Sequence, residues 1–446
     1  MVIMNKQAWI ESSKRAGFEA FEIYEHRSTS TSIQVYEQKV DSYTISDCDG
    51  IAMRGLYNGK MGNIFLEEVI DKDMDLVLEQ IKQNASVITS EDKVLIQAPA
   101  DAYPTITKRE NALIQTDNDK KIALLKQLED TLLHMHPAIA QVMETGYSED
   151  TSYRGITNSK GMQLHDDDSN SIIYAGILLK EKEDTKSAFH WQYIKSLDDF
   201  DVDAFAKELC ELGVSKLHAD MVESGTYPVL MKREAMNSLF SALCGLYDGE
   251  NAYKGISILK GKQDTKIFDE KITIVDDPFM KEGVNSCGFD DEGSVCMRKD
   301  VVKDGVLKTY LHNTKSALLM GTNTTGNGFK AGYGGPVSIS PTNFYIENGE
   351  QSYQDMIASM KKGVIVTELN GLHAGLNPVS CEFSLQSEGF LVEDGKIVKP
   401  INLFTIAGNF ITMMNAITSV GNDLKMGMSG VGTPSILFDA IAVSGK

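Results

Sequence analysis

Four Asn-Gly or Asp-Gly dipeptides, each lying between two apolar arms, constrain the fold of this 446-residue chain more than any other feature. They are Asn58-Gly59, Asp304-Gly305, Asn348-Gly349 and Asp394-Gly395. Asn, Asp and Gly tolerate the positive φ angles of two-residue hairpin turns, so each dipeptide predicts a β-hairpin. Three of them lie beyond residue 300, which indicates an antiparallel, β-rich second half with few helices.

The first half of the chain mixes helical and strand patterns. Apolar residues recur at three-to-four spacing in Asp71–Gln83 and Lys120–His134, as they do on the buried face of a helix. The stretch Gln141–Leu197 instead alternates as strands do. We also expect short helices at Lys6–Arg15 and Asp201–His218, strands at Phe21–Tyr24 and Ser32–Tyr36, and turns at Tyr153–Gly155, Ser159–Gly161 and Asp166–Asp168.

Two composition changes suggest where the domains meet. The segment Thr89–Asp117, with Pro99 and Pro104, is the best linker within the first half. A helix pattern ends near Met221–Thr226 and a strand pattern starts after Gly225, so we place the domain boundary there. The predicted fold is α+β: an N-terminal α/β sandwich-like domain over 1–220, then an antiparallel β-rich C-terminal domain over 221–446.

Charge and cysteine usage narrow the functional classes. The chain carries 43 basic and 63 acidic residues, a formal net charge of −20. Such a surface repels phosphate backbones and anionic lipid, so we expect neither nucleic acid nor a membrane as the main partner. The N-terminus lacks a signal-peptide pattern, no window approaches about 18 consecutive apolar residues, and the six cysteines are scattered. These features predict a cytoplasmic protein with free thiols.

Several separated motifs of the second half resemble the TldD/PmbA family. They are IVDDPF at 274–279, GFDDEG at 288–293, DGVLKTYLHN, TTGNG ending at Gly328, GLNPVSCEFSLQSEG, VGNDL and GTPSI. In the first half SDCDGIAMRGLYNGKMGNIF is similar to the family's glycine-and-arginine hairpin. The resemblance covers most of the chain. One departure is Cys381-Glu382, where the family usually has Gly-Asp, and a cysteine at positive φ would be strained.

The resemblance implies a zinc-dependent peptidase that acts on small or unfolded peptides through paired subunits. TldD-like subunits carry a His-Glu-x-x-x-His helix and a distant cysteine ligand, whereas PmbA-like subunits, also called TldE, share the fold without those ligands. Roles ascribed to the family include maturing a microcin precursor and degrading an antitoxin, and an older label is modulator of DNA gyrase.

The stretch NSLFSALCGLYDG at 237–249 indicates which subunit type this chain is. Aligned with the family without gaps, Phe240, Ser241 and Gly245 stand at the expected His, Glu and His positions. None of the eight histidines is followed by glutamate, and no cysteine follows Cys381. We therefore expect no catalytic residue and no metal or other cofactor in this chain, with zinc in a TldD-like partner. Taken alone, Leu239, Leu243 and Leu246 form an apolar stripe that predicts core packing.

Four other groups of residues could form a metal or catalytic site, and each also has a purely structural interpretation. The His134/His136 pair could ligate a metal, or it could be a solvated helix end. The Cys287/Cys296 pair could also ligate a metal, or it could be two free thiols. Cys381 with His373 could form a nucleophile pair, or Cys381 could simply be a small side chain in a glycine-rich loop beside a hydrogen-bonded histidine. The run Asp290–Glu292 could bind a cation or act as acid and base, or it could be a hydrogen-bonded turn. Possible peptide-groove or loop residues are Asn327, Asn377, Ser380 and Glu382.

These observations leave two classes of function open. The first is a PmbA-like subunit that binds an unfolded peptide by strand addition and acts in a hetero-oligomer with a TldD-like protease subunit. The second is a stand-alone homodimer that binds peptides or regulates a partner, including the gyrase-modulator role.

Overall fold

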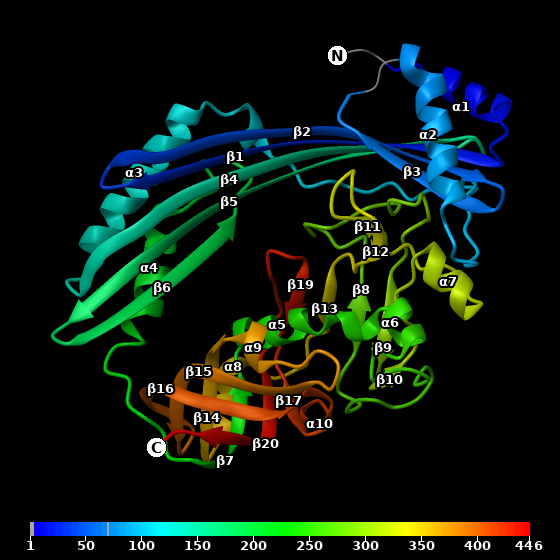
Figure 1. The fold of residues 1–446 in the computed structure, drawn as a ribbon. Helices are drawn as coiled ribbons and strands as arrows, with labels where there is room; N and C mark the ends of the chain where they lie inside the picture. The colour runs from blue at the N-terminus through cyan, green and yellow to red at the C-terminus, as the bar shows by residue number, and fades with distance from the viewer. Residues whose placement is uncertain (1–3, 69–70) are drawn as a thin grey trace.

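The computed structural model describes residues 4–68 and 71–446, and it has two halves that lie one above the other (Figure 1). The N-terminal half is built on one six-stranded antiparallel sheet in the order β3-β2-β1-β4-β5-β6. Its strands are long and arch over the C-terminal half (Figure 1). They are β1 (Ala20–Tyr36), β2 (Lys39–Tyr57), β3 (Lys60–Leu66), β4 (Ile139–Asn158), β5 (Gln163–Glu181) and β6 (Asp184–Tyr193).

Two pairs of helices cover opposite ends of one face of this sheet. Helices α1 (Lys6–Arg15) and α2 (Met74–Ser86) bury Ile23, whereas α3 (Asn118–Met135) and α4 (Val202–Val214) bury Ile33. Both isoleucines are odd-numbered residues of β1, and alternate residues of a strand share a face. Within the described residues, none of these four helices packs on the even-numbered face, where Tyr24 instead packs with Phe289 of the C-terminal half. The α+β, sandwich-like first domain is confirmed.

The two strands predicted in this region form, but as parts of one longer strand, and two predicted turns are wrong. Phe21–Tyr24 and Ser32–Tyr36 are the ends of the single strand β1. Tyr153–Gly155 lies inside β4 and Asp166–Asp168 inside β5, where Arg154 and Asp166 are paired in register. Arg154 pairs across the sheet with Asp166 at 3.1 Å and reaches Asp291 of the other half at 2.8 Å, and Asp166 also pairs with Lys108 at 3.0 Å, so these charges are satisfied without breaking the strands. The turn at Ser159–Gly161 lies between β4 and β5, as predicted.

The barrel of the C-terminal half consists of strands in the order β16-β15-β14-β7-β20, and β16 also pairs with β20, so this sheet closes on itself. Closure leaves these strands without a free edge along that seam. Strand β17 adds to β20. The strands are β7 (Gly225–Met231), β14 (Lys362–Asn370), β15 (Glu382–Glu393), β16 (Lys396–Asn409), β17 (Ile417–Val420) and β20 (Ile436–Ser444).

A second sheet, in the order β10-β9-β8-β13-β19-β18, lies beside the barrel. Its strands are β8 (Ile274–Asp276), β9 (Lys299–Lys303), β10 (Val306–Leu307), β13 (Phe344–Ile346), β18 (Lys425–Met426) and β19 (Val431–Thr433), and β11 (Gly328–Lys330) pairs with β12 (Val337–Ile339). Short helices connect the strands: α5 (Arg233–Ala242), η3 (Cys244–Tyr247), α6 (Gly249–Lys254), α7 (Thr314–Met320), α8 (Tyr353–Ser359), α9 (Leu372–Gly375) and α10 (Phe410–Met413).

Three of the four predicted hairpins form. Asn58, Asp304 and Asp394 each have φ near +50° and are followed by a glycine of positive φ. The fourth is wrong: β13, just before Asn348-Gly349, pairs in parallel with β19, and the Asn348 side chain accepts a hydrogen bond from the Leu424 amide at 2.8 Å. The asparagine therefore holds a distant loop and does not turn the chain back on itself.

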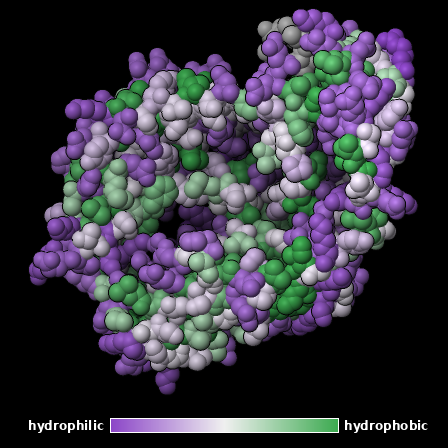
Figure 2. Space-filling view, viewed as in Figure 1, coloured by the Kyte–Doolittle hydropathy of each residue, from purple (hydrophilic) through white to green (hydrophobic). Residues whose placement is uncertain are grey.

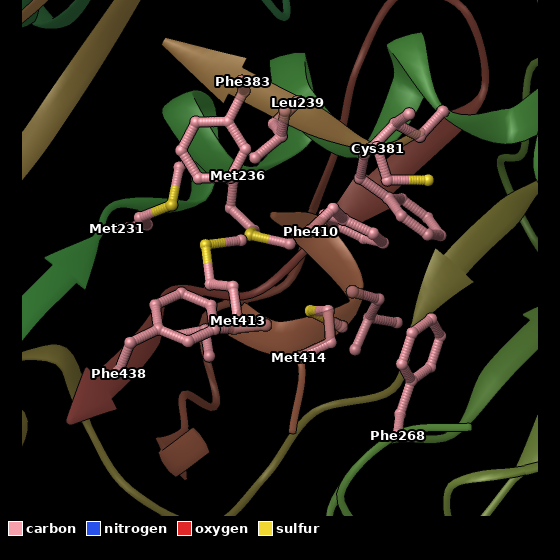
Figure 3. Packing of buried hydrophobic residues seen from close by; sticks show 14 of the residues in the cluster. Met231, Met236, Leu239, Phe268, Cys381, Phe383, Phe410, Met413, Met414 and Phe438 are labelled. Atoms are coloured by element: carbon pink, nitrogen blue, oxygen red, sulfur yellow. The ribbon is translucent and has the colours of Figure 1, made fainter. Parts of the chain in front are cut away.

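One continuous core joins the barrel, the second sheet and α5. In Figure 3 methionine and aromatic side chains from α5, β15, β20 and α10 interleave in this core. The buried residues include Met231, Met236, Leu239, Phe268, Cys381, Phe383, Phe410, Met413, Met414 and Phe438. Helix α5 is therefore an integral part of the C-terminal core. Among the helices of the described residues, none combines the length and apolar character that a membrane crossing requires.

The two halves dock through buried ion pairs on the helix-free face of the long sheet. Arg154 of β4 lies 2.8 Å from an Asp291 carboxylate oxygen and donates to the Phe289 carbonyl at 2.8 Å. Arg54 of β2 lies 3.7 Å from Glu292. Asp291 and Glu292 are 4% and 5% exposed, so water screens these pairs poorly. Docking of the halves therefore depends on matched charges from both.

The segment between α2 and α3 also connects the halves. Between Val87 and Asp117 it contains the short turn η2 (Ala112–Gln115) and no other helix or strand. The Tyr103 hydroxyl donates to the Gly293 carbonyl at 2.8 Å, and the Gln97 amide donates to the Thr314 hydroxyl at 3.0 Å. This segment is therefore packed along the junction.

We predict that Arg154→Ala lowers the free energy of unfolding by about 3–5 kcal/mol, because removing one member of a buried pair leaves the Asp291 charge uncompensated. Urea denaturation followed by circular dichroism measures the change. The control is Lys207→Ala, since Lys207 forms an exposed pair with Glu211 at 3.9 Å and should change stability by less than about 1 kcal/mol. Equal effects of the two substitutions would contradict the role given to Arg154.

Candidate functional site

The predicted helix and glycine-bearing turn at 237–249 form as α5, the 3₁₀ turn η3 and the start of α6. Helix α5 ends at Ala242, and the Leu243 amide bonds to the Phe240 carbonyl at 3.0 Å as the helix tightens. Asp248 then caps α6 by accepting from the Glu250 and Asn251 amides at 2.7 and 3.0 Å. The segment is well ordered by its own hydrogen bonds.

Of the residues at the three expected zinc-ligand positions, Phe240 belongs to the core, Ser241 is half-buried and Gly245 is exposed. Phe240 is fully buried and stacks on Phe344, with ring centroids 5.3 Å apart and an interplanar angle of 7°. Tyr247 packs edge-on against both rings. The predicted stripe of Leu239, Leu243 and Leu246 is buried, which confirms core packing. The ring of Phe240 is therefore held by core packing on Phe344 and Tyr247.

Zinc does not fit the side chains at these three positions. It binds imidazole, thiolate or carboxylate, whereas Phe240 offers an apolar ring, Ser241 a hydroxyl and Gly245 no side chain. Across residues 4–68 and 71–446, no group of three or more His, Cys, Asp or Glu side chains lies close enough to hold a metal ion. That zinc is held by a partner, and not by this chain, remains a prediction.

The cysteines near this turn are poor nucleophiles. Burial raises the pKa of Cys244 to about 12 and that of Cys381 to about 11, so both stay protonated near neutral pH. Cys381 is fully buried in the core, whereas His373 is exposed. The structure therefore does not bring these two residues together as a catalytic pair. Cys381 does adopt the strained positive φ, 63°, that its replacement of glycine predicted.

The run Asp290–Glu292 forms a buried turn. Asp290 accepts from the amides of Glu292 and Ser294 at 3.0 and 2.9 Å, and from Gly328 at 2.8 Å. Burial, and then the neighbouring Glu292 carboxylate, raise the pKa of Asp290 to about 8. Asp291 and Glu292 instead pair with the arginines of the long sheet. The turn interpretation fits, because every carboxylate of the run has a protein partner.

The two histidines that could have formed a metal-binding pair, His134 and His136, have separate partners. His134 Nδ1 lies 2.8 Å from the Asp130 carbonyl oxygen on the exposed side of α3. His136 follows that helix in extended backbone and accepts from the Ala138 amide at 3.1 Å. They complete a helix end and do not converge on one point. Cys287 and Cys296, by contrast, lie side by side, with sulfurs 3.6 Å apart.

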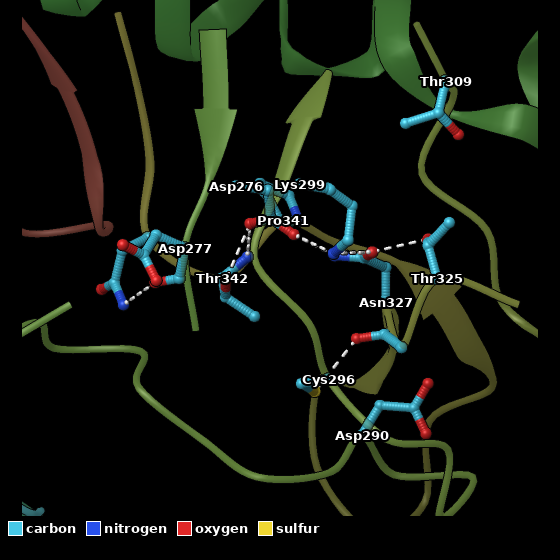
Figure 4. A network of polar contacts seen from close by, with 12 residues as sticks. Asp276, Asp277, Asp290, Cys296, Lys299, Thr309, Thr325, Asn327, Pro341 and Thr342 are labelled. Atoms are coloured by element: carbon cyan, nitrogen blue, oxygen red, sulfur yellow. Dashed lines mark hydrogen bonds and ion pairs between the residues drawn. The ribbon is translucent and has the colours of Figure 1, made fainter. Parts of the chain in front are cut away.

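The four possible groove residues separate into two groups. Asn327 lies in the loop before β11, where it is fully buried and holds a polar network (Figure 4). Its amide donates to Asp276 at 2.8 Å, and its oxygen accepts from Lys299 at 3.0 Å. The other three lie together around a surface cavity of about 550 Å³ that Asn377 and Glu382 line; Ser380 contacts Glu382 at 3.2 Å.

A larger cleft of about 990 Å³ lies between the two halves, where the space-filling view is hollowed (Figure 2). The exposed face of α5 forms part of its wall through Arg233, Glu234, Asn237 and Ser238. The sequence could not predict this cleft, because its walls come from β6, α4, α5 and the barrel, which are far apart along the chain. The local signal for the cleft was the polar face of α5, a helix whose other face is buried in the core.

The cleft wall combines a free strand edge with charges of both signs. Within the described residues, β6 pairs only with β5, so its other edge, along Lys186–Trp191, faces the cleft. The Asn237 side-chain oxygen is buried and has no partner in the described part of the chain. The wall holds five basic residues (Lys186, Lys216, Lys232, Arg233, Lys425) and five acidic ones (Glu208, Glu211, Glu234, Glu368, Glu388).

Comparisons with known proteins identify the family. Family models described as PmbA/TldA metallopeptidase domain 1, central domain and C-terminal domain match residues 21–85, 111–217 and 224–445. The chain belongs to the PmbA/TldA metallopeptidase family. A metalloprotease PmbA homologue from Buchnera aphidicola is 29% identical over 274 residues, 61% of this chain. This chain spans 58% of that relative's length.

Solved structures of similar proteins cover nearly the whole chain. A Thermotoga maritima MSB8 protein described as a candidate modulator of a DNA gyrase is 27% identical, with a TM-score of 0.91 over 98% of this chain and 99% of that one. TldE from Thermococcus kodakarensis shares the fold at 22% identity and a TM-score of 0.89, over 98% and 99% of the two chains. The two-half PmbA/TldA architecture is thus shared from end to end.

We predict that Phe240→Ala lowers the free energy of unfolding by about 3–5 kcal/mol, because it leaves a cavity beside Phe344. Ser241→Ala, at the adjacent half-buried position, should change stability by less than about 1 kcal/mol. Chemical denaturation of both variants measures the difference. A small effect of Phe240→Ala would mean that this turn is loosely packed and open to a ligand.

We predict that Asp290→Asn reduces the pH dependence of stability between about pH 4 and pH 8. The pKa of Asp290 is raised in the folded state, from an ordinary 3.8 to about 8. Its contribution is therefore fully present below pH 3.8 and is lost as the pH rises through about 8. Unfolding free energies of both proteins at pH 5 and pH 8 test this. The wild type should lose more stability than the variant over that interval, and an equal loss would contradict the raised pKa.

Proposed function

We propose that this chain is a PmbA-like, or TldE-like, subunit that binds small or unfolded peptides and acts with a TldD-like zinc peptidase subunit, itself holding no zinc. The observation that carries the proposal is Phe240, which stands at the first ligand position and stacks on Phe344 in the core. Helix α5 therefore packs in the core with its apolar face and lines the cleft with its polar face. Peptide-bond cleavage is therefore assigned to the partner subunit, in the cytoplasm.

The cleft supports peptide binding by backbone pairing. An extended peptide has one donor and one acceptor per residue, and the free edge of β6 offers matching groups by strand addition. The unpaired Asn237 oxygen can accept one further N–H. Because basic and acidic side chains are equal in number on the wall, no net charge selects among sequences. These features suit peptides of varied sequence.

We predict that the purified chain alone contains no stoichiometric zinc and cleaves no peptide, whereas adding a cognate TldD-like chain produces cleavage that a chelator abolishes. Elemental analysis, native mass spectrometry and a fluorogenic unfolded peptide provide the readouts. A mixed oligomer with metal-dependent cleavage supports the subunit role. Stoichiometric zinc and chelator-sensitive cleavage by this chain alone would refute it, and a homodimer indifferent to the TldD-like chain would favour the stand-alone function.

We predict that Asn237→Leu weakens binding of an unfolded peptide by about fivefold, the value of one hydrogen bond to an otherwise unpaired group. Fluorescence anisotropy with a labelled peptide measures the affinity. The comparison variant is Glu382→Gln, a conservative change at the smaller cavity, which should leave the affinity unchanged. If instead only Glu382→Gln weakens binding, the peptide lies in the smaller cavity and not in the cleft between the halves.

A further inference from the structure

The hairpin that docks the two halves carries a pair of thiols at its base. Its arms run from Cys287 and back through Cys296, and they are joined by the Cys296 amide bonding to the Gly288 carbonyl at 3.1 Å and by a bridge between Phe289 and Val295. The Asp290 amide closes the turn on the Ser294 carbonyl at 2.9 Å. The two sulfurs lie 3.6 Å apart and are free thiols.

We propose that Cys287 and Cys296 are a site of oxidative modification, at which a small hydroperoxide converts the dithiol to a disulfide that cross-links the base of the docking hairpin. The sulfurs need to approach one another by only about 1.5 Å to form a bond. Both side chains are at most 5% exposed, so the oxidant class is one small enough to enter without unfolding.

The surroundings distinguish the two sulfurs. The Cys296 thiol, and then the Arg154 guanidinium, lower the pKa of Cys287 despite its burial. The contact with Cys287, together with burial, raises the pKa of Cys296 well above its ordinary value. The Cys296 sulfur also lies 3.1 Å from the Gly326 carbonyl oxygen. Cys287 is thus the sulfur that reacts first as a thiolate, and Cys296 is the sulfur that completes the bond.

The reaction balances with hydrogen peroxide as the oxidant. The Cys287 thiolate attacks one peroxide oxygen, the O–O bond breaks, and the departing hydroxide takes a proton to become water, which leaves a sulfenic acid. The Cys296 sulfur then attacks the Cys287 sulfur, an S–S bond forms and the S–O bond breaks. The second hydroxide leaves as water with the Cys296 proton. Two thiols and one peroxide give one disulfide and two waters.

The disulfide would act on the contact between the halves. The tip between the two cysteines holds Asp291 and Glu292, which pair with Arg154 and Arg54 of the long sheet. Cross-linking the arms fixes the tip in its docked shape, because a closed loop of this length has far fewer unfolded conformations. The oxidation state of the Cys287/Cys296 pair therefore affects the contact between the two halves.

Treating the reduced full-length chain with hydrogen peroxide tests the proposal by intact mass and peptide mapping. We expect a loss of about 2 Da, mapped to a link between Cys287 and Cys296 and reversed by dithiothreitol. In Cys296→Ser, dimedone should trap a sulfenic acid at Cys287, whereas Cys287→Ser should give neither product. The control Cys244→Ser should still form the link. Oxidation with no loss of mass, or a link that maps to other cysteines, would overturn the proposal.

Discussion

The contact between an acidic hairpin and two arginines determines how the halves of this protein are arranged. Arg54 and Arg154 lie on the helix-free face of the long sheet, and Asp291 and Glu292 reach them from the C-terminal half. Each arginine also has a carboxylate partner within the long sheet, Glu22 at 2.7 Å from Arg54 and Asp166 at 3.1 Å from Arg154. The acidic hairpin completes the pairing of these buried charges, and removing it would leave them less compensated. The acidic hairpin joins the halves at one end of the long sheet, and at the other end β6 forms a wall of the cleft opposite α5 and the barrel. A Lys216–Glu368 pair at 2.5 Å also connects the halves at the cleft.

The core of the C-terminal half explains how this fold is stable although residues 240, 241 and 245 offer none of the side chains that zinc prefers. Phe240 and Phe344 stack in a continuous core, and Leu239, Leu243 and Leu246 complete the buried face of the segment. Aromatic packing of this kind stabilises the helix directly, so the segment needs no metal to fold. The same helix turns Asn237 and its neighbours toward the cleft. One helix therefore serves the core with one face and the cleft with the other.

Local patterns predicted much of this architecture, and contacts between distant segments account for the rest. The Asn58-Gly59 turn, the first helix and the closing hairpins follow from residues adjacent in the chain. The sequence predicts turns at Arg154 and at Asp166–Asp168, but both segments continue as strands, because Arg154 pairs across the sheet with Asp166 and also with Asp291, which lies 137 residues away. Asn348 failed as a turn for the same reason, since its side chain holds a distant loop. Alignment of motifs predicts that Phe240 stands at a ligand position, but only the fold shows the ring against which it stacks.

The central claim is that Phe240 is packed in the core and that the segment around Phe240, Ser241 and Gly245 holds no metal. Crystals of the chain soaked in zinc and measured on both sides of the zinc absorption edge test it directly. The account predicts no anomalous peak within bonding distance, about 2–2.3 Å, of any atom of that segment. An ordered zinc peak there, with protein ligands around it, would contradict the account.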